Sequence, residues 1–217
     1  MDKTAQQAFI KESLDKIIVP GQVVELRALG VPDGSGYWTV TGFFDDHDKL
    51  AEAAQFLDSS KAKGIYFTPN PLRVDIGESG KRNTLYRATR GSAAKDVDIK
   101  ETKWLLIDVD PSRPANMSSS EDEKAAALSV VSKVRTFLDG KGWPAPLFAD
   151  SGNGYHLMYR CEGLTPEVHK QVLDFLAFRF NEDAYAVVDQ AVHNPSRIWK
   201  VYGTKSRKGD DSTDRPW

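Results

Sequence analysis

The sequence has a single cysteine, Cys161, in 217 residues. One thiol excludes an intramolecular disulfide and a cysteine-rich zinc site, and we expect a chain that works in a reducing cytoplasm. No apolar run approaches the roughly 20 residues that a membrane span requires. The first residues also lack the apolar segment of a signal peptide. The sequence therefore predicts a cytoplasmic protein without a membrane partner.

An excess of charge of one sign is also missing. The chain carries 29 Lys and Arg residues against 31 Asp and Glu residues, which gives a net charge of −2. This balance excludes a globally basic surface for nucleic acid, although a local basic patch can still bind one. The hydrophobic fraction, 40%, is ordinary for a folded protein and predicts one large domain or two small lobes.

The most informative stretch is an apolar run that ends in two acids, Trp104-Leu-Leu-Ile-Asp-Val-Asp110. Its length and composition predict a buried strand. Side chains alternate along a strand, so Asp108 and Asp110 are expected on one face. Neighbouring carboxylates repel each other, and a divalent cation such as Mg²⁺ relieves that repulsion. The alternative is a strand that runs into a polar loop where both acids are solvated.

The N-terminal half predicts a helix, a hairpin, a second helix and another strand. The helices are expected at residues 2–18 and 45–57, and the strands at 23–29, 36–44 and 65–68. The order strand, helix, strand indicates a βαβ-like unit in a mixed α/β layer. Residues 72–100 are polar and contain Gly77, Gly80 and Gly91, so we expect a long surface loop with, at most, a short helix.

The C-terminal half predicts two further helices and four strands. A helix starting at Ser119 or Ser120 and ending at Gly140 has acids in its first turn that complement the helix dipole, so we interpret them as structural. Thr165 caps a second helix that ends at Asn181. Strands are expected at residues 146–149, 155–159, 186–189 and 197–202. The polar segment 205–217 is typical of a linker.

Three more clusters carry chemistry. The turn Ser151-Gly-Asn-Gly-Tyr-His156 has glycines whose backbone N–H groups can converge on an anion, although a hairpin turn of this kind needs no function. Asp189 ends another apolar run, either as a third metal ligand or as an ordinary strand end. The run Arg197-Ile-Trp-Lys200 supplies cations that either bind phosphates or simply form a solvated strand edge.

These clusters, in this order, resemble the archaeo-eukaryotic primase superfamily. The resemblance is to the primase-polymerase domains of phages, plasmids and mobile elements. It rests on Leu105-Leu-Ile-Asp-Val-Asp110, Ser151-Gly-Asn-Gly-Tyr-His156 and Val187-Val-Asp189, followed by Arg-Ile-Trp-Lys-x-Tyr-Gly-Thr, and extends from about Val23 to Lys208.

The resemblance implies an α/β (α+β) fold with two lobes, one of them RRM-like, and a mixed β-sheet flanked by helices. The expected layout is an N-terminal helix at 1–20 and a catalytic domain at 21–208, followed by a polar tail or linker at 209–217. Within the catalytic domain, residues 21–100 form the N-terminal lobe and residues 101–204 the RRM-like catalytic lobe.

The implied activity is that of a DNA-directed primase-polymerase in the replication of a phage or mobile element. Asp108, Asp110 and Asp189 would be catalytic and would hold two Mg²⁺ or Mn²⁺ ions. The nucleotide-binding residues would be Ser151, Gly152, Asn153, Gly154, His156, Arg197, Lys200 and Asn70. The basic loop residues would follow the single-stranded DNA template and its primer: Lys81, Arg82, Arg87 and Arg90. NTPs or dNTPs would be substrates.

Many relatives in this superfamily carry a zinc element or a helical accessory domain, and with one cysteine no zinc is expected here. An accessory region or a helicase is expected beyond the C-terminus. Two alternatives remain open at the level of sequence. One is a metal-dependent nuclease or phosphatase that uses the same carboxylates, with His156 as acid or base. The other is a non-catalytic replication-initiator module that binds DNA.

Overall fold

The computed structural model describes residues 2–76, 81–181 and 185–217. Met1, in the predicted N-terminal helix, and Gly77 and Gly80, in the predicted loop, lie outside the described residues. The chain divides into two compact units. Unit 1 comprises Met1–Glu101 and Pro195–Arg207, and unit 2 comprises Thr102–Asn194 and Lys208–Trp217. Each unit contains helices and an antiparallel sheet, so the fold is α+β with two lobes.

Unit 1 is built on a five-stranded sheet in the order β4-β2-β1-β3-β9. Its elements are α1 (Lys3–Asp15), β1 (Val24–Pro32), β2 (Tyr37–Phe44), α2 (His47–Ser59), β3 (Gly64–Phe67), β4 (Tyr86–Arg87), the 3₁₀ helix η2 (Asp96–Asp98) and β9 (Trp199–Lys200). The predicted hairpin is confirmed, because β1 pairs antiparallel with β2. The strands β2 and β3, joined by α2, each pair antiparallel with β1, so they run parallel with β1 between them.

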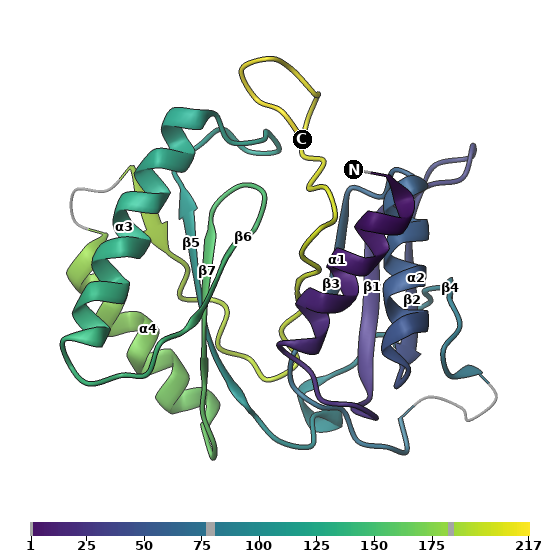
Figure 1. The fold of residues 1–217 in the computed structure, drawn as a ribbon, viewed down its shortest axis with the longest axis horizontal. Helices are drawn as coiled ribbons and strands as arrows, with labels where there is room; N and C mark the ends of the chain where they lie inside the picture. The colour runs from purple at the N-terminus through teal and green to yellow at the C-terminus, as the bar shows by residue number, and fades with distance from the viewer. Residues whose placement is uncertain (1, 77–80, 182–184) are drawn as a thin grey trace. The chain divides into compact units, whose positions relative to one another are not determined.

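The two helices of unit 1 pack against each other (Figure 1). Each starts at an aspartate whose carboxylate accepts backbone N–H groups of the first turn, Asp2 for α1 and Asp46 for α2. Their apolar stripes bury side chains together with one face of the sheet. The members of this core are Ile10, Leu14, Leu50, Ala54, Leu57, Val24, Leu26, Ala28, Ile65 and Phe67.

Residues 72–100 were predicted as a polar surface loop, and this prediction is wrong for part of the segment. Leu72 and Ala94 are buried with Val23 and Phe43 in a second apolar cluster. Leu72 also forms a β-bridge with Ile99. The physical reason is that β1 presents alternate side chains to its other face, and this segment covers them.

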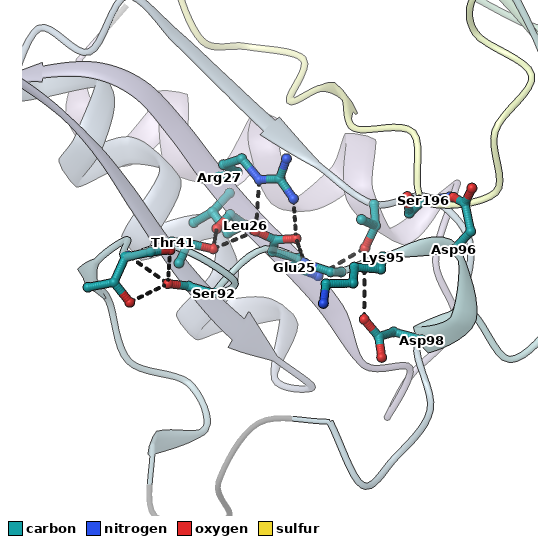
Figure 2. Close-up of polar contacts among 12 residues, drawn as sticks. Glu25, Leu26, Arg27, Thr41, Ser92, Lys95, Asp96, Asp98 and Ser196 are labelled. Carbon is teal, nitrogen blue, oxygen red and sulfur yellow. Dashed lines mark hydrogen bonds and ion pairs between the residues drawn. The ribbon is translucent and has the colours of Figure 1, made fainter.

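A buried carboxylate ties that segment to β1 (Figure 2). Glu25 is fully buried. Both of its oxygens accept hydrogen bonds from the Arg27 guanidinium, at 2.8 and 2.6 Å. The Thr41 hydroxyl donates to Oε1 at 2.6 Å, and the Ala94 N–H donates to Oε2 at 2.9 Å. Because its charge is fully partnered, Glu25 tolerates burial.

Unit 2 has a four-stranded antiparallel sheet in the order β6-β7-β5-β8. Its elements are β5 (Trp104–Pro111), α3 (Glu121–Asp139), β6 (Leu147–Asp150), β7 (Tyr155–Arg160), α4 (Pro166–Phe180) and β8 (Ala186–Val188). The chain order βαββαβ, with each helix joining two parallel strands that have a third strand between them, is the ferredoxin-like arrangement. Figure 1 shows α3 and α4 on one side of this sheet.

The helices of unit 2 begin where the sequence predicted. Ser120 caps α3, and Glu123 returns a hydrogen bond to the Ser120 N–H, which completes a capping box. Thr165 caps α4, with Pro166 in the first turn. The buried faces of both helices cover the apolar side of β5 and β7: Ala127, Val131, Val134, Leu138, Leu173, Leu176, Ala177, Leu105, Ile107, Val109 and Leu157.

Three expectations need correction. The sheets are not mixed, because every neighbouring strand pair is antiparallel. Residues 195–204 do not join unit 2, which contains the rest of the predicted catalytic lobe: β9 pairs with β3, which places this segment in unit 1. The tail at 209–217 is not a free linker, because Arg215 donates two hydrogen bonds to the Glu123 carboxylate, both at 2.7 Å.

None of the helices in the described part of the chain combines the length and apolar character that crossing a membrane requires.

Candidate active site

Two carboxylates lie at the end of β5 on the same face of the unit 2 sheet. Asp108 and Asp110 alternate with Ile107 and Val109, which are fully buried. The Asp108 side chain is 20% exposed and that of Asp110 is 36% exposed. Burial, and next the charge of Asp108, raise the pKa of Asp110 above its usual value. The predicted pair of interacting acids is therefore present.

His156 lies directly opposite Asp108. The two residues are register partners in the β5–β7 pair, and His156 Nε2 is 3.4 Å from Asp108 Oδ1. On the other side of β5, the Asp189 N–H donates to the Asp108 carbonyl at 2.8 Å, which places Asp189 at the end of β8 beside Asp108. The Asp189 carboxylate accepts the Ala191 N–H at 2.8 Å. Register thus brings the three sequence motifs to one end of one sheet.

The glycine-rich turn lies against Asp110. A Cβ atom built on Gly154 would be 2.7 Å from Asp110 Oδ1 and would overlap the Val109 carbonyl oxygen, so only glycine fits there. Within the turn, Ser151 N–H donates to the Gly154 carbonyl at 3.0 Å and Gly154 N–H to Ser151 Oγ at 3.0 Å. Gly152 N–H donates to Asp150 Oδ1 at 2.6 Å. An anion at these N–H groups would compete with these contacts.

Asn153, predicted to contact a nucleotide, has a structural role in this turn. Its side chain is buried, and its amide oxygen accepts the Ser119 N–H at 3.0 Å. Its carbonyl accepts the Ser119 hydroxyl at 2.6 Å. Ser119 directly precedes the residue that caps α3. Asn153 therefore fixes the turn to the start of that helix, next to the carboxylate pair.

A residue that the sequence reasoning missed, Arg113, faces Asp110. Its Nη2 is 3.5 Å from Asp110 Oδ2, and its Nε donates to the Met117 carbonyl at 3.1 Å. The positive charges of Arg113 and Lys208 oppose the rise in the pKa of Asp110. Arg113 lies in a loop between two prolines, so no helix or strand periodicity indicates where its side chain points. Its position three residues after Asp110 was the one feature of the sequence that indicated a place near the carboxylates.

The carboxylate pair fits a divalent cation in two respects. Asp108 Oδ1 is buried and accepts no hydrogen bond from any described residue. The negative charge of Asp108 opposes the ionisation of Asp110, and a bound cation would instead favour the ionised form of both carboxylates. Within residues 2–76, 81–181 and 185–217, however, no group of three or more His, Cys, Asp or Glu side chains converges on a metal-sized site. A metal here would therefore rest on Asp108 and Asp110.

The remaining predicted nucleotide contacts belong to unit 1. Asn70 is buried and its Nδ2 donates to the Pro195 carbonyl at 3.0 Å. Lys200, in β9, is also buried, and its Nζ donates to the Lys205 carbonyl at 2.8 Å. Arg197 is half-buried and lies just before β9. These three residues thus cluster around the segment that returns the chain to unit 1.

The four basic residues predicted to follow the template lie in unit 1 and differ in their surroundings. Arg82 donates to Asp45 Oδ2 at 3.2 Å and to the carbonyls of Val74 and Ile76, so it ties a loop together. Arg87, in β4, is exposed and lies 4.0 Å from Asp33 Oδ2. Lys81 and Arg90 are exposed. Lys81, Arg87 and Arg90 therefore present their charges at the surface, whereas Arg82 is mostly engaged internally.

Comparisons with protein-family models, with curated proteins and with solved structures found no match to this chain.

Proposed function

We propose that this chain is a template-dependent nucleotidyltransferase of the primase-polymerase type. The observation that carries the proposal is the meeting of Asp108, Asp110 and His156 at one end of the unit 2 sheet, with Asp108 Oδ1 buried and accepting no hydrogen bond among the described residues. The βαββαβ order of unit 2 supports it, because an RRM-like half is expected to have this topology.

In the proposed reaction a 3′-hydroxyl attacks the α-phosphate of a nucleotide, and pyrophosphate leaves. Asp108 and Asp110 would hold Mg²⁺ or Mn²⁺, which when bound supplies charge neutralisation at the attacking and leaving oxygens. The resemblance assigns Asp189 as a third ligand, but among the described residues its carboxylate does not converge with this pair, so it would add negative charge from the adjacent strand end. His156 would donate a hydrogen bond to a phosphate oxygen beside the pair, which would position the substrate rather than perform a separate chemical step.

The glycine turn has a supporting part in this proposal. Gly154 lets the turn approach Asp110 without a clash, and Ser151 and Gly152 border the same end of the sheet. Of the unit 1 residues, the resemblance assigns Asn70, Arg197 and Lys200 to nucleotide binding, and Lys81, Arg87 and Arg90 to template binding. Single-stranded DNA with a primer, and NTPs or dNTPs, are thus the proposed partners.

The test is extension of a labelled primer on a single-stranded template, with dNTPs or NTPs and with Mg²⁺ or Mn²⁺. Asp108→Ala and Asp110→Ala should each abolish extension, whereas Asp122→Ala, which removes an exposed carboxylate from the first turn of α3, should retain it. Circular dichroism establishes that the variants are folded. A template shortened in place of an extended primer would instead identify a nuclease. Tight DNA binding without any change to either strand would identify a non-catalytic module.

A further inference from the structure

Arg113 is a buried cation whose hydrogen-bonding capacity is only partly used. Its side chain is 10% exposed. The Nε donates to the Met117 carbonyl at 3.1 Å, and Nη2 lies 3.5 Å from Asp110 Oδ2, beyond the usual range for a strong charge-assisted bond. The Nη1 atom is buried and finds no acceptor in the described part of the chain. A guanidinium has five N–H groups, so this one is left short of partners.

Such an arrangement is costly unless a ligand completes it. Leaving a buried donor without an acceptor forfeits its hydration, and the penalty is larger when the group is charged. The ligand that best suits a guanidinium is an anion with two or more oxygens, because the planar fork of N–H groups matches a carboxylate or phosphate. The Met117 carbonyl holds the fork by Nε and so fixes the direction in which Nη1 points.

The surroundings favour an anion shared with Asp110. Arg113 acts electrostatically on two acids, Asp110 and Glu123. Lys208 also acts on Asp110, and Arg215 also acts on Glu123. Glu123 is already held by Arg215, through two hydrogen bonds of 2.7 Å. The Ser118 hydroxyl donates to the Lys208 carbonyl at 3.0 Å, which keeps the tail beside the loop that carries Arg113. The loop and the tail thus bring two cations, Arg113 and Lys208, close to Asp110.

We propose that Arg113 Nη1 donates to a phosphate oxygen of the nucleotide that binds beside Asp110. This inference rests on the proposed function, and it adds to that site a phosphate-binding residue from the loop after β5. Arg113 Nη2 also lies 3.5 Å from Asp110 Oδ2, so one guanidinium would lie between a carboxylate of the candidate metal site and the substrate phosphate. Arg113 is therefore expected to set the affinity for the triphosphate rather than for the base.

The experiment measures binding of Mg²⁺-dATP, Mg²⁺-ATP and pyrophosphate to the full chain by calorimetry. Arg113→Met should weaken binding of all three about tenfold or more, since one charge-assisted hydrogen bond is lost. Arg113→Lys should restore part of the affinity, because it keeps the charge and loses the fork. Arg135→Met, which removes an exposed arginine from α3, should bind as the unaltered protein does. In primer extension, the loss should appear as a higher KM for the nucleotide.

The proposal would be overturned if folded Arg113→Met and Arg113→Lys both bound the ligands as tightly as the unaltered chain. It would also be overturned if the unaltered chain bound none of the three ligands. A measurement on the unaltered chain does not depend on variant folding. Mg²⁺-dATP should shift the NMR signal of the Arg113 guanidinium, with the Arg135 signal as the internal control, and an unchanged Arg113 signal would also overturn the proposal. If nucleotide binding depended on Arg113 but the chain could not extend a primer, the polymerase activity would be refuted and the Arg113 proposal would stand.

Discussion

Asp108 and His156 are direct cross-strand neighbours, with Oδ1 and Nε2 3.4 Å apart. They are 48 residues apart in the sequence and meet only because β7 pairs with β5 in one particular register. Residues on a strand alternate between the two faces, so a shift of β7 by one residue would turn His156 to the opposite side of the sheet. The register between these two strands is therefore part of the site, as much as the two side chains are.

The raised pKa of Asp110 predicts a specific dependence of stability on pH. Burial, and next the Asp108 charge, lift the pKa above the ordinary value of 3.8, so the folded state holds this proton more tightly than the unfolded chain. Stability is consequently lost as pH rises from about 3.8 through the folded pKa. Without metal, Asp110→Asn should melt at a higher temperature than wild type at neutral pH, and the difference should vanish below pH 3.8. A less stable Asp110→Asn at neutral pH would contradict this.

Addition of Mg²⁺ should reverse the order of stability. A ligand that binds the folded state stabilises it by mass action, by about 2.7 kcal/mol at a hundredfold excess over Kd. The melting temperature of wild type should therefore rise by several degrees, and that of Asp110→Asn much less. The measurement is calorimetry with EDTA, Mg²⁺ or Mn²⁺. An equal response in the two proteins would show that the ion binds elsewhere.

Gly154→Ala should damage both the fold and the site. The new methyl group would overlap the Val109 carbonyl and press against Asp110 Oδ1, so we expect a loss of about 1–3 kcal/mol in the free energy of unfolding. Nucleotide binding should weaken as well. Gly140→Ala is the control, because its Cβ would meet Thr136 O at an ordinary 3.4 Å. Denaturant unfolding measures the free energy of unfolding of both variants. An equally small loss in Gly154→Ala and Gly140→Ala would argue against the close contact of Gly154 with Val109 and Asp110.

Glu25→Ala should be among the most destabilising substitutions in unit 1. It would leave Arg27 without its carboxylate and the Ala94 N–H without an acceptor, at a cost of about 3 kcal/mol or more. The exposed pair of Arg73 and Asp75 offers the control, and Asp75→Ala should change the unfolding midpoint little. If Glu25→Ala unfolded at the wild-type denaturant concentration, Glu25 would not be what fastens the 72–100 segment to β1.

Acid should release the C-terminal tail. The Arg215 guanidinium holds the pKa of Glu123 below its ordinary 4.5. The contact therefore stabilises the fold above pH 4.5, and this contribution is lost as pH falls through the folded pKa. Wild type should be more stable than Glu123→Gln above pH 5, and the two should converge at lower pH. Hydrogen exchange in residues 208–217, corrected for intrinsic rates, should rise over the same interval. If residues 208–217 exchanged at the same rate in wild type and in Glu123→Gln above pH 5, the contact between Arg215 and Glu123 would not anchor the tail.

Local patterns predicted the elements of this fold well. The apolar stripe and acidic first turn of α3 located that helix, and the turn at residues 32–36 located the β1–β2 hairpin. Alternation along β5 also placed Asp108 and Asp110 on one face. Each of these features depends on residues a few positions apart, and short-range rules govern such spacings.

Relationships between distant segments could not be predicted in the same way. Nothing near Trp199 specifies that β9 pairs with β3, so the segment was assigned to the wrong lobe. The loop that carries Arg113 is fastened by Ser118 to Lys208, 90 residues further along the chain. The 72–100 segment reads as polar because its few apolar residues, such as Leu72 and Ala94, are widely spaced, although they pack together in space.

The return of residues 195–207 to unit 1 has a consequence for synthesis of the chain. The edge strand β9 emerges from the ribosome long after β3, and the unit 2 segment Thr102–Asn194 is synthesised between them. Until then the free edge of β3 exposes unpaired backbone groups, which are a template for association with other chains. A chain that stops before Trp199 should therefore aggregate even though most of unit 1 is present, and the Thr102–Asn194 part of unit 2 must be synthesised before unit 1 can be completed.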